Sequence, residues 1–183
     1  MIEREKVNIK NLSRKKGQSG IALINVLEDG RNEVVAFAGI NKNSKRKQVS
    51  NKELEACSIV IGTMELEEVE TSDLFKRAKQ KNCLTILNLA PYKAPSKLLL
   101  EQIDILVVNE TEFLGLLNYA PQTVDIDFID KNFSSLNIPS HVNVVITLGD
   151  LGVFAYANGK RKYFKSRKAV SYTHLTLPTI NWV

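Results

Sequence analysis

Two oxygen-bearing side chains three residues apart, Asn109 and Glu112, are the best candidates for chemistry in this sequence. They follow the β-branched apolar run 105–108, which predicts a strand buried on both faces, and they begin a stretch with helical leucine spacing. Ligands of open parallel α/β sheets bind outside the carboxyl ends of the strands. An amide and a carboxylate there suit Mg²⁺, which keeps several waters and binds few protein oxygens. The structural alternative is that Asn109 caps the helix and that Glu110 and Glu112 are favoured by its dipole.

The elements that must position these residues alternate regularly from residue 53 onward. Strands are predicted at 57–61, 83–87, 105–108 and 143–147. Helices are predicted between them, and Thr71 or Ser72 is expected to cap the first. Strands alternating with helices of this length predict βαβ units, a parallel sheet and right-handed crossovers. The expected fold class is therefore α/β, with a mostly parallel sheet flanked by helices.

Two hairpins are predicted outside this alternation. Residues 21–27 and 33–38 are strand-like and are joined through Asp29-Gly30, a strong hairpin signal, so they predict an antiparallel ribbon apart from the main sheet. Near the other end of the chain, Asn158-Gly159 predicts a second tight hairpin. The expected organisation is a ribbon with its preceding segment at 1–40, a partial α/β core at 41–169 and a separate tail at 170–183.

Charge and cysteine usage narrow the classes of partner. The net charge is +5, but the basic excess lies at the two ends and the centre of the chain is acidic. The basic run 42–47 lacks interleaved aromatic residues, so we interpret it as a solvated loop and expect no nucleic-acid partner. Cys57 and Cys83 sit in apolar runs and are interpreted as small buried residues in a reducing compartment.

No membrane segment is expected in this chain. No apolar run approaches the roughly 18 residues that a spanning helix needs, and the first ten residues do not resemble the core of a signal peptide. The default expectation is therefore a cytoplasmic protein with no membrane partner.

Residues 170–183 differ from everything before them. They carry no charged side chain, although a strongly basic stretch precedes them. Back-translated, residues 170–179 resemble a transposon-end adapter used in sequencing libraries. We therefore interpret the tail as non-native and exclude it from fold reasoning. His174 and Trp182 consequently receive no functional weight.

Five stretches, in chain order, resemble motifs of one known family. They are 19–24 with 38–41 (a Thr-Gly-x-Ala opening and a Gly-Ala-Asn turn), 63–65 (Gln-Leu-Glu), 86–91 (Leu-Asn-Pro-Ala-Pro), 108–112 (Pro-Asn-Glu-Thr-Glu) and 146–152 (Thr-Leu-Gly-Ser-x-Gly). The matches depart from these patterns at several positions, among them Leu89, Val108 and Asp150, which replace proline, proline and serine. Taken together, residues 1–169 resemble the ribokinase-like (PfkB) family of sugar kinases.

This resemblance implies a three-layer ribokinase-like fold with a small antiparallel β lid. It also implies transfer of the ATP γ-phosphoryl group to a sugar hydroxyl, with Mg²⁺ as the metal and ATP as co-substrate. The implied metal residues are Asn109 and Glu112. The implied nucleotide-binding residues are Asn109, Thr147, Leu148, Gly149, Asp150, Leu151 and Gly152. The implied sugar-binding residues are Glu65 and, from the lid, Ala22 and Ile40. A homodimer through the lid is a further implied partner.

Two motifs of the family are missing from residues 1–169. These are a Gly-Gly sugar motif and a Gly-Ala-Gly-Asp motif that supplies the catalytic base, which is expected beyond Ala169. The expectation is therefore an internal fragment, truncated at both ends, without its catalytic base and without activity. The alternatives are a related fructokinase or adenosine kinase, a non-catalytic sugar-, nucleoside- or nucleotide-binding protein of the same fold, and an interaction module whose exposed ribbon pairs with another chain.

Overall fold

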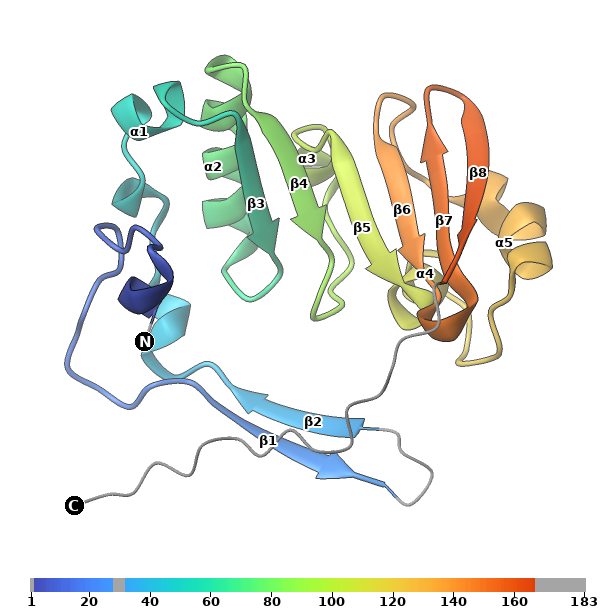
Figure 1. Ribbon diagram of the computed structural model, residues 1–183, viewed down its shortest axis with the longest axis horizontal. Helices are drawn as coiled ribbons and strands as arrows, with labels where there is room; N and C mark the ends of the chain where they lie inside the picture. The colour runs from blue at the N-terminus through green and yellow to red at the C-terminus, as the bar shows by residue number, and fades with distance from the viewer. Residues whose placement is uncertain (1, 28–31, 167–183) are drawn as a thin grey trace.

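The β-strands form two separate sheets in the computed structural model, which describes residues 2–27 and 32–166 (Figure 1). A two-stranded antiparallel ribbon contains β1 (Ile21–Val26) and β2 (Asn32–Phe37). The second sheet has the strand order β3-β4-β5-β6-β7-β8. Its strands are β3 (Ile59–Thr63), β4 (Leu84–Asn88), β5 (Ile105–Asn109), β6 (Asn143–Thr147), β7 (Gly152–Ala157) and β8 (Lys160–Lys165).

Strands β3 to β6 run parallel, and β7 and β8 extend the sheet antiparallel. The predicted α/β class, the mostly parallel sheet with helices and the separate antiparallel ribbon are therefore confirmed. Asn158 and Gly159 join β7 to β8 with φ angles of +52° and +76°. Both values are positive, as a type I′ turn requires, which explains why Asn-Gly occupies this position.

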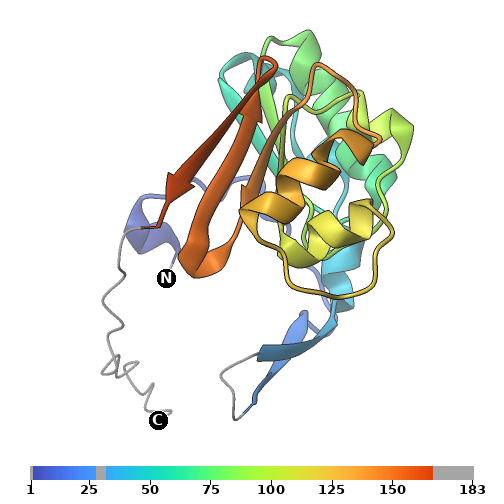
Figure 2. The ribbon, with the colours of Figure 1, turned by 90° about the vertical axis from the view of Figure 1, so that its right-hand side faces the viewer.

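Helices α2 to α5 lie together on one side of the six-stranded sheet (Figure 2). The α-helices are α1 (Asn51–Glu55), α2 (Glu68–Gln80), α3 (Lys97–Leu100), α4 (Glu110–Leu116) and α5 (Ile126–Asn132). Short 3₁₀ turns are η1 (Ile2–Glu5), η2 (Gly39–Asn43), η3 (Arg46–Gln48), η4 (Phe133–Ser135) and η5 (Gly149–Leu151). In the part of the chain that the structure describes, no helix is both long and apolar enough to cross a bilayer.

The core lies between these helices and the sheet. Side chains on one face of the strands, among them Leu106 and Val108, are buried against Phe75 of α2 and Phe113 of α4. Ile105 and its neighbours on the opposite face are only half-buried. The expectation that β5 is buried on both faces is thus wrong, because the described helices that cover the sheet lie on one side of it.

Two local predictions also need correction. Helix α2 begins at Glu68, so Thr71 and Ser72 are buried residues inside the helix and do not cap it. Cys83 is buried as expected, but Cys57 is exposed because it lies before the first residue of β3. The predicted tail, with His174 and Trp182, and the catalytic base expected beyond Ala169 lie outside the described residues, as does the Asp29-Gly30 turn.

Candidate active site

Polar residues end four adjacent parallel strands, and all four therefore lie at the same edge of the sheet. Thr63, Asn88, Asn109 and Thr147 are the last residues of β3, β4, β5 and β6. Thr63 is the cross-strand partner of Asn88, and Asn109 is that of Thr147. Because ligands of open α/β sheets bind outside this edge, the register brings the two predicted nucleotide residues Asn109 and Thr147 side by side in a suitable place.

Asn109 and Glu112 form a reciprocal capping box at the start of α4. The Asn109 Oδ1 accepts from the Glu112 amide at 2.9 Å, and a carboxylate oxygen of Glu112 accepts from the Asn109 amide at 2.8 Å. These bonds satisfy two amides that a helix start leaves without partners. The helix cap by Asn109, which the sequence offered as the alternative to a metal site, is therefore present. It also fixes where the Glu112 carboxyl group lies.

The capping box leaves ligand capacity for a metal ion. Glu112 is only 5% exposed, and only one of its carboxylate oxygens is used by the cap. Among the described residues there is no cluster of three His, Cys, Asp or Glu side chains suited to a metal ion. A metal at Glu112 would thus depend on water and substrate oxygens. This donor set fits Mg²⁺, which commonly binds one or two carboxylates together with phosphates.

The turn after β6 presents backbone at the same edge. Gly149 has a φ of +50°, and only the Glu110 carboxylate comes near an added Cβ there, at 3.9 Å. Gly152 has a φ of +116°, and a Cβ there would lie 2.1 Å from the Phe164 carbonyl oxygen. The turn is closed by the Leu148 amide, which donates to the Gly152 carbonyl at 2.8 Å. Gly149 is therefore open to a ligand, whereas Gly152 is required by the fold.

The remaining residues of this turn differ in exposure. Leu148 is buried in the core, while Asp150 and Leu151 are exposed. The Tyr163 hydroxyl of β8 donates to the Leu151 carbonyl and holds the turn against the sheet. The exposed position of Asp150 means that its carboxylate is not buried among the backbone amides of the turn.

The predicted sugar residues lie at the same end of the molecule but are not in one pocket. Glu65 is exposed just after β3, and its amide donates weakly to Thr63 Oγ1 at 3.4 Å. Ala22 is exposed on the ribbon, which lies beyond the carboxyl edge of the sheet (Figure 1). Ile40 is half-buried at the base of the ribbon, against Gly17. The structure thus brings Asn109, Glu112 and Thr147 together and leaves the sugar residues apart.

One charged residue near this edge, Lys93, was missed from the sequence, and another, Glu110, was considered there only for the helix dipole. The Lys93 ammonium donates to the Met64 carbonyl at 3.1 Å. Met64 is the residue directly before Glu65, so this bond holds Lys93 near the predicted sugar residue. Glu110 reaches towards Gly149, as described above. Lys93 is the one basic residue in the segment between β4 and α3, which is a signal that the sequence already carried.

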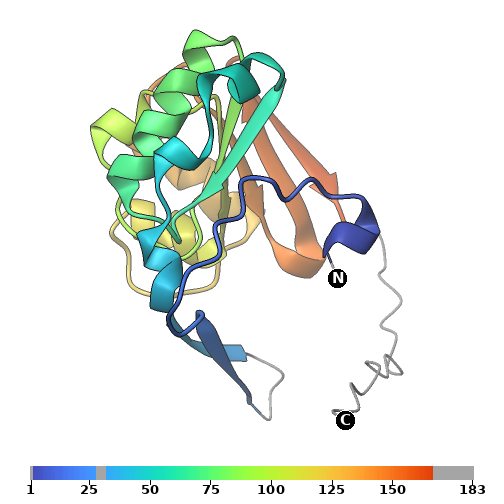
Figure 3. The same cartoon turned by 90° about the vertical axis from the view of Figure 1, so that its left-hand side faces the viewer.

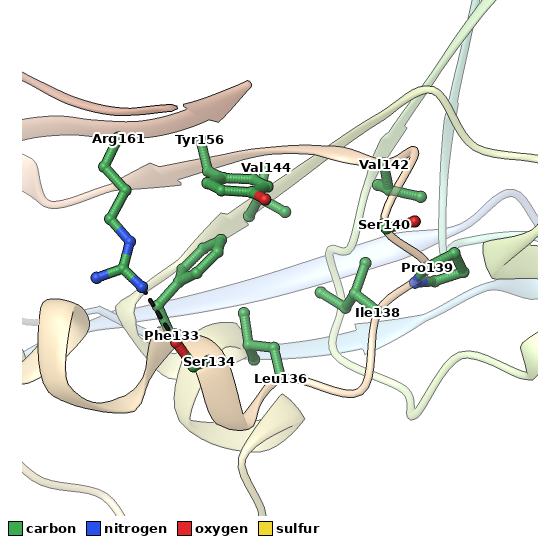
Figure 4. Close-up of a pocket in the computed structure, with 10 residues that line it drawn as sticks. All are labelled: Phe133, Ser134, Leu136, Ile138, Pro139, Ser140, Val142, Val144, Tyr156 and Arg161. Carbon is green, nitrogen blue, oxygen red and sulfur yellow. Dashed lines mark hydrogen bonds between the residues drawn. The ribbon is translucent and has the colours of Figure 1, made fainter. Parts of the chain in front are cut away.

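A cavity among the described residues lies away from this edge of the sheet. This cavity of about 240 Å³ is lined by Tyr156 of β7, by Arg161 of β8 and by residues of the 133–144 segment, among them Phe133, Leu136 and Ile138 (Figure 4). Arg161 lies at its rim and donates to Ser134 Oγ at 3.1 Å. None of the residues predicted to bind sugar, nucleotide or metal lines this cavity.

The fold and the carboxyl-edge residues define an α/β protein that carries a glycine turn beside an acidic helix start at this edge. The family model described as pfkB family carbohydrate kinase matches residues 1–173. The chain therefore belongs to the pfkB family of carbohydrate kinases.

Relatives and solved structures agree with this assignment. Ribokinase from Dictyostelium discoideum is 31% identical over 149 residues, covering 73% of this chain and 46% of that protein. Ribokinase from Staphylococcus aureus (strain COL) is 30% identical over 164 residues, covering 87% and 52%. A ribokinase structure from Thermotoga maritima superimposes with a TM-score of 0.67 at 25% identity, covering 86% of this chain and 51% of that one. The chain thus spans about half the length of the curated relatives it matches.

Proposed function

We propose that this chain is part of an ATP-dependent sugar kinase that transfers the ATP γ-phosphoryl group to a sugar hydroxyl. The single observation that carries the proposal is the pairing of Asn109 with Thr147, which sets the acidic start of α4 beside the glycine turn. Family membership and the ribokinase relatives support it. A solved ribokinase of Arabidopsis thaliana is described as complexed with ribose and ATP.

The proposed nucleotide site is the turn from Thr147 to Gly152 together with Asn109. The backbone of Gly149 carries no side chain, and the nearest atom to an added Cβ is a Glu110 carboxylate oxygen at 3.9 Å, so phosphate oxygens can approach the Gly149 backbone from the remaining directions. Asn109 is the cross-strand partner of Thr147, so its Nδ2 is a further donor beside this turn, whereas the Thr147 hydroxyl already donates to the Val108 carbonyl at 3.3 Å. Phosphoryl transfer is catalysed mainly by positioning and by neutralising charge, and these groups supply the positioning.

The proposed metal is Mg²⁺, held through Asn109, Glu112 and water. When bound, the ion neutralises charge on the phosphates. The capping box contributes by fixing the Glu112 carboxylate before any ligand arrives, since the Asn109 amide holds one of its oxygens at 2.8 Å. A preorganised carboxylate loses little freedom when it binds an ion.

The proposed sugar site has Glu65 as a hydrogen-bond acceptor, and Ala22 and Ile40 as the apolar inner side of a lid. The ribbon also exposes Leu23, Ile24, Val26, Val34 and Phe37, each more than half exposed. Apolar strands exposed in this way are a suitable surface for a second copy of the chain. We therefore propose that two copies of the chain form a homodimer through the ribbon.

We further propose that the enzyme is cytoplasmic. Its domain organisation is proposed to be a ribbon with its preceding segment at 1–40, an α/β core at 41–169 and a non-native tail at 170–183.

The 183-residue chain by itself is proposed to bind ligands without turnover. Within the described residues no aspartate stands in a glycine-rich turn that begins an α-helix, and Asp150 lies in the short 3₁₀ turn η5, which precedes strand β7. A positioned general base commonly contributes about 10²–10⁴-fold to such a reaction. Binding is therefore the appropriate assay for this chain.

The test is a titration of the ¹⁵N-labelled chain with ATP, with and without Mg²⁺, followed by amide chemical shifts. We expect shifts at 109–112 and 147–152, and tighter binding when Mg²⁺ is present. Glu112→Gln should remove most of the Mg²⁺ dependence, about tenfold, whereas Glu101→Gln, an exposed carboxylate on the helical side, should not. Glu65→Ala should weaken ribose binding and leave ATP binding unchanged. ATP-induced shifts confined to other segments would refute the site.

A further inference from the structure

The β1–β2 ribbon is connected to the rest of the molecule by two segments, 12–20 and 38–50, which meet at its base (Figure 3). There the Ile40 amide donates to the Gln18 carbonyl at 2.9 Å. Gly39 has a φ of +54°, and a Cβ on it would lie 2.4 Å from the same carbonyl oxygen. Only glycine permits this approach, so the two segments are joined into one unit.

A side chain reinforces this junction farther from the ribbon. The Gln48 side-chain amide donates to the Asn11 carbonyl at 3.1 Å. We call residues 11–20 and 38–50 the ribbon root. Because its two segments are bonded to each other twice, whatever holds one of them to the sheet also holds the other.

Helix α2 holds the ribbon root by both backbone groups of one residue, Arg46. The Arg46 amide donates to the Glu70 carboxylate at 2.9 Å, and the Arg46 carbonyl accepts from the Arg77 guanidinium at 2.6 Å. The same guanidinium donates to the Val49 carbonyl at 2.9 Å and to Asn51 Oδ1 at 3.0 Å. An arginine has five donors in a rigid fork, so a single side chain can hold three acceptors in fixed directions.

The burial of its central carboxylate, Glu70, distinguishes this cluster from an ordinary surface ion pair. Glu70 is 8% exposed, and it also accepts from the Lys45 ammonium at 3.1 Å. The Arg46 amide and the Lys45 ammonium hold the pKa of Glu70 below its usual range, so the carboxylate stays charged at neutral pH. Asp73 completes the cluster by accepting from the Arg77 Nε at 3.0 Å. Hydrogen bonds between a backbone group and a charged side chain are among the stronger ones in proteins.

The holding helix also sits next to the proposed sugar site. Helix α2 begins at Glu68, three residues after Glu65, and it follows the strand that ends at Thr63. Its N-terminal turn supplies Glu70. The residue proposed to accept from the sugar and the residue that holds the ribbon root are therefore carried by one short stretch of chain.

We infer that Glu70 and Arg77 are positioning residues that clamp the Arg46 backbone and thereby fix the orientation of the β1–β2 ribbon over the carboxyl edge of the sheet. The clamp is the fixed point, and ribbon movement is confined to the chain between it and the strands. The inference rests on the proposed function only in naming the ribbon as the cover of a sugar site. Loss of the clamp frees the ribbon without altering Asn109, Glu112 or the glycine turn.

The first measurement is amide hydrogen exchange of the full chain. Glu70→Ala should lower protection of the Arg46 amide roughly tenfold or more, since it removes a charged acceptor. Glu70→Gln should lower it less, because its side-chain oxygen can still accept from the amide. Glu67→Ala is the matched control, since Glu67 is an exposed acid at the start of the same helix without a side-chain capping bond. The control should keep the parent's protection within twofold.

The second measurement is the distance distribution between spin labels at Leu23→Cys on the ribbon and Gln80→Cys on α2. A Cys57→Ser background is needed because Cys57 is exposed. Glu70→Ala and Arg77→Ala should broaden the distribution, and Lys76→Ala, an exposed cation of α2, should not. Neither measurement needs a nucleotide or a sugar. The clamp inference can therefore be refuted while the proposed function stands, and the proposed function can be refuted while the clamp inference stands.

Circular dichroism decides whether each variant is folded. If Glu70→Ala does not fold, Glu70→Gln and Arg77→Ala carry the test, with reduced Arg46 protection and a broadened distribution as the expected results. A folded Glu70→Ala with the parent's protection and distribution overturns the inference. Equal broadening in Lys76→Ala also overturns it.

Discussion

Glu112 is a buried acidic side chain whose direction is set by a single backbone hydrogen bond. The Asn109 amide donates to one of its oxygens, and Asn109 in turn accepts from the Glu112 amide. Capping and metal binding are therefore compatible at this position, because the cap occupies one oxygen and directs the other. The sequence presented them as alternatives, and the geometry allows both.

The two glycines of the turn after β6 should separate ligand binding from folding. Gly149→Ala adds a side chain without a steric clash but at a positive φ, which costs about 1–2 kcal/mol, and it blocks close approach of a phosphate. We expect roughly tenfold weaker ATP binding in a folded protein. Gly152→Ala instead drives a Cβ into the Phe164 carbonyl and should cost about 3 kcal/mol or more. Urea unfolding and calorimetric ATP titration of both variants measure these effects.

A Gly149→Ala variant that binds ATP as tightly as the parent would show that phosphate does not approach this backbone. A Gly152→Ala variant as stable as the parent would show that the turn adjusts to a side chain.

Helix α2 begins at Glu68, among acidic residues, and not at Thr71 or Ser72, which were expected to cap it. Glu68 and Glu70 lie in its first turn, where the helix dipole favours negative charge. Glu70 belongs to a run of acidic residues with Glu65, Glu67 and Glu68, but unlike the exposed Glu65 and Glu67 it is buried. It is buried because Lys45 and the Arg46 backbone approach it from the ribbon root. The burial of Glu70 thus depends on a segment 24 residues away.

Asp104 joins three elements through one carboxylate and should make stability depend on pH. It accepts from the Lys79 ammonium at 2.7 Å, from the Thr85 amide at 2.8 Å and from the Thr85 hydroxyl at 2.9 Å. Burial alone would raise the pKa of Asp104, but the bonds from Lys79 and Thr85 outweigh it and lower the pKa. Its contribution is therefore present above about pH 4, the ordinary value for aspartate, and is lost as pH falls through the lowered value.

We expect Asp104→Asn to lower the free energy of unfolding by about 1–2 kcal/mol at pH 7. The difference from the parent should shrink as the pH falls below about 4. Urea unfolding from pH 7 to pH 3 measures it, with Asp150→Asn as the control for an exposed carboxylate. A difference that stays constant over this range would mean that the Asp104 charge does not contribute.

The two edges of the six-stranded sheet differ in chemistry. Strand β8 carries four basic residues in six, which discourage pairing with another strand. Strand β3 has no charge, and it exposes Ile59 and Ile61 at 52% and 68%. An uncharged apolar edge accepts further strands, so association of the whole molecule should occur at β3 in addition to the ribbon.

Ile61→Lys should therefore reduce self-association of the chain, because a lysine on an edge strand opposes pairing. The control is Leu98→Lys, since Leu98 is 67% exposed but lies on α3, away from both edges. Light scattering over a concentration series should show a lower apparent mass for Ile61→Lys than for the parent, and no change for Leu98→Lys. Equal effects of the two variants would assign association to general surface hydrophobicity.

The sequence by itself determined the features that depend on neighbouring residues. The spans of β5 and β6 and the Asn-Gly hairpin were predicted closely, and a helix cap by Asn109 was named as the alternative to a metal site, because apolar runs, turn residues and cap residues act within a few positions of the chain. The separate antiparallel ribbon was also predicted, from two strands with no helix between them.

Tertiary structure decided the features that join distant segments. Pairing across 24, 25 and 29 positions buries Glu70 against Arg46, joins Lys79 to Asp104 and brings Lys93 to Met64. The exposure of Cys57 and the half-buried second face of β5 also depend on which elements pack where. No local pattern encodes these contacts, because crossover connections bring the partners together only when the parallel sheet has formed.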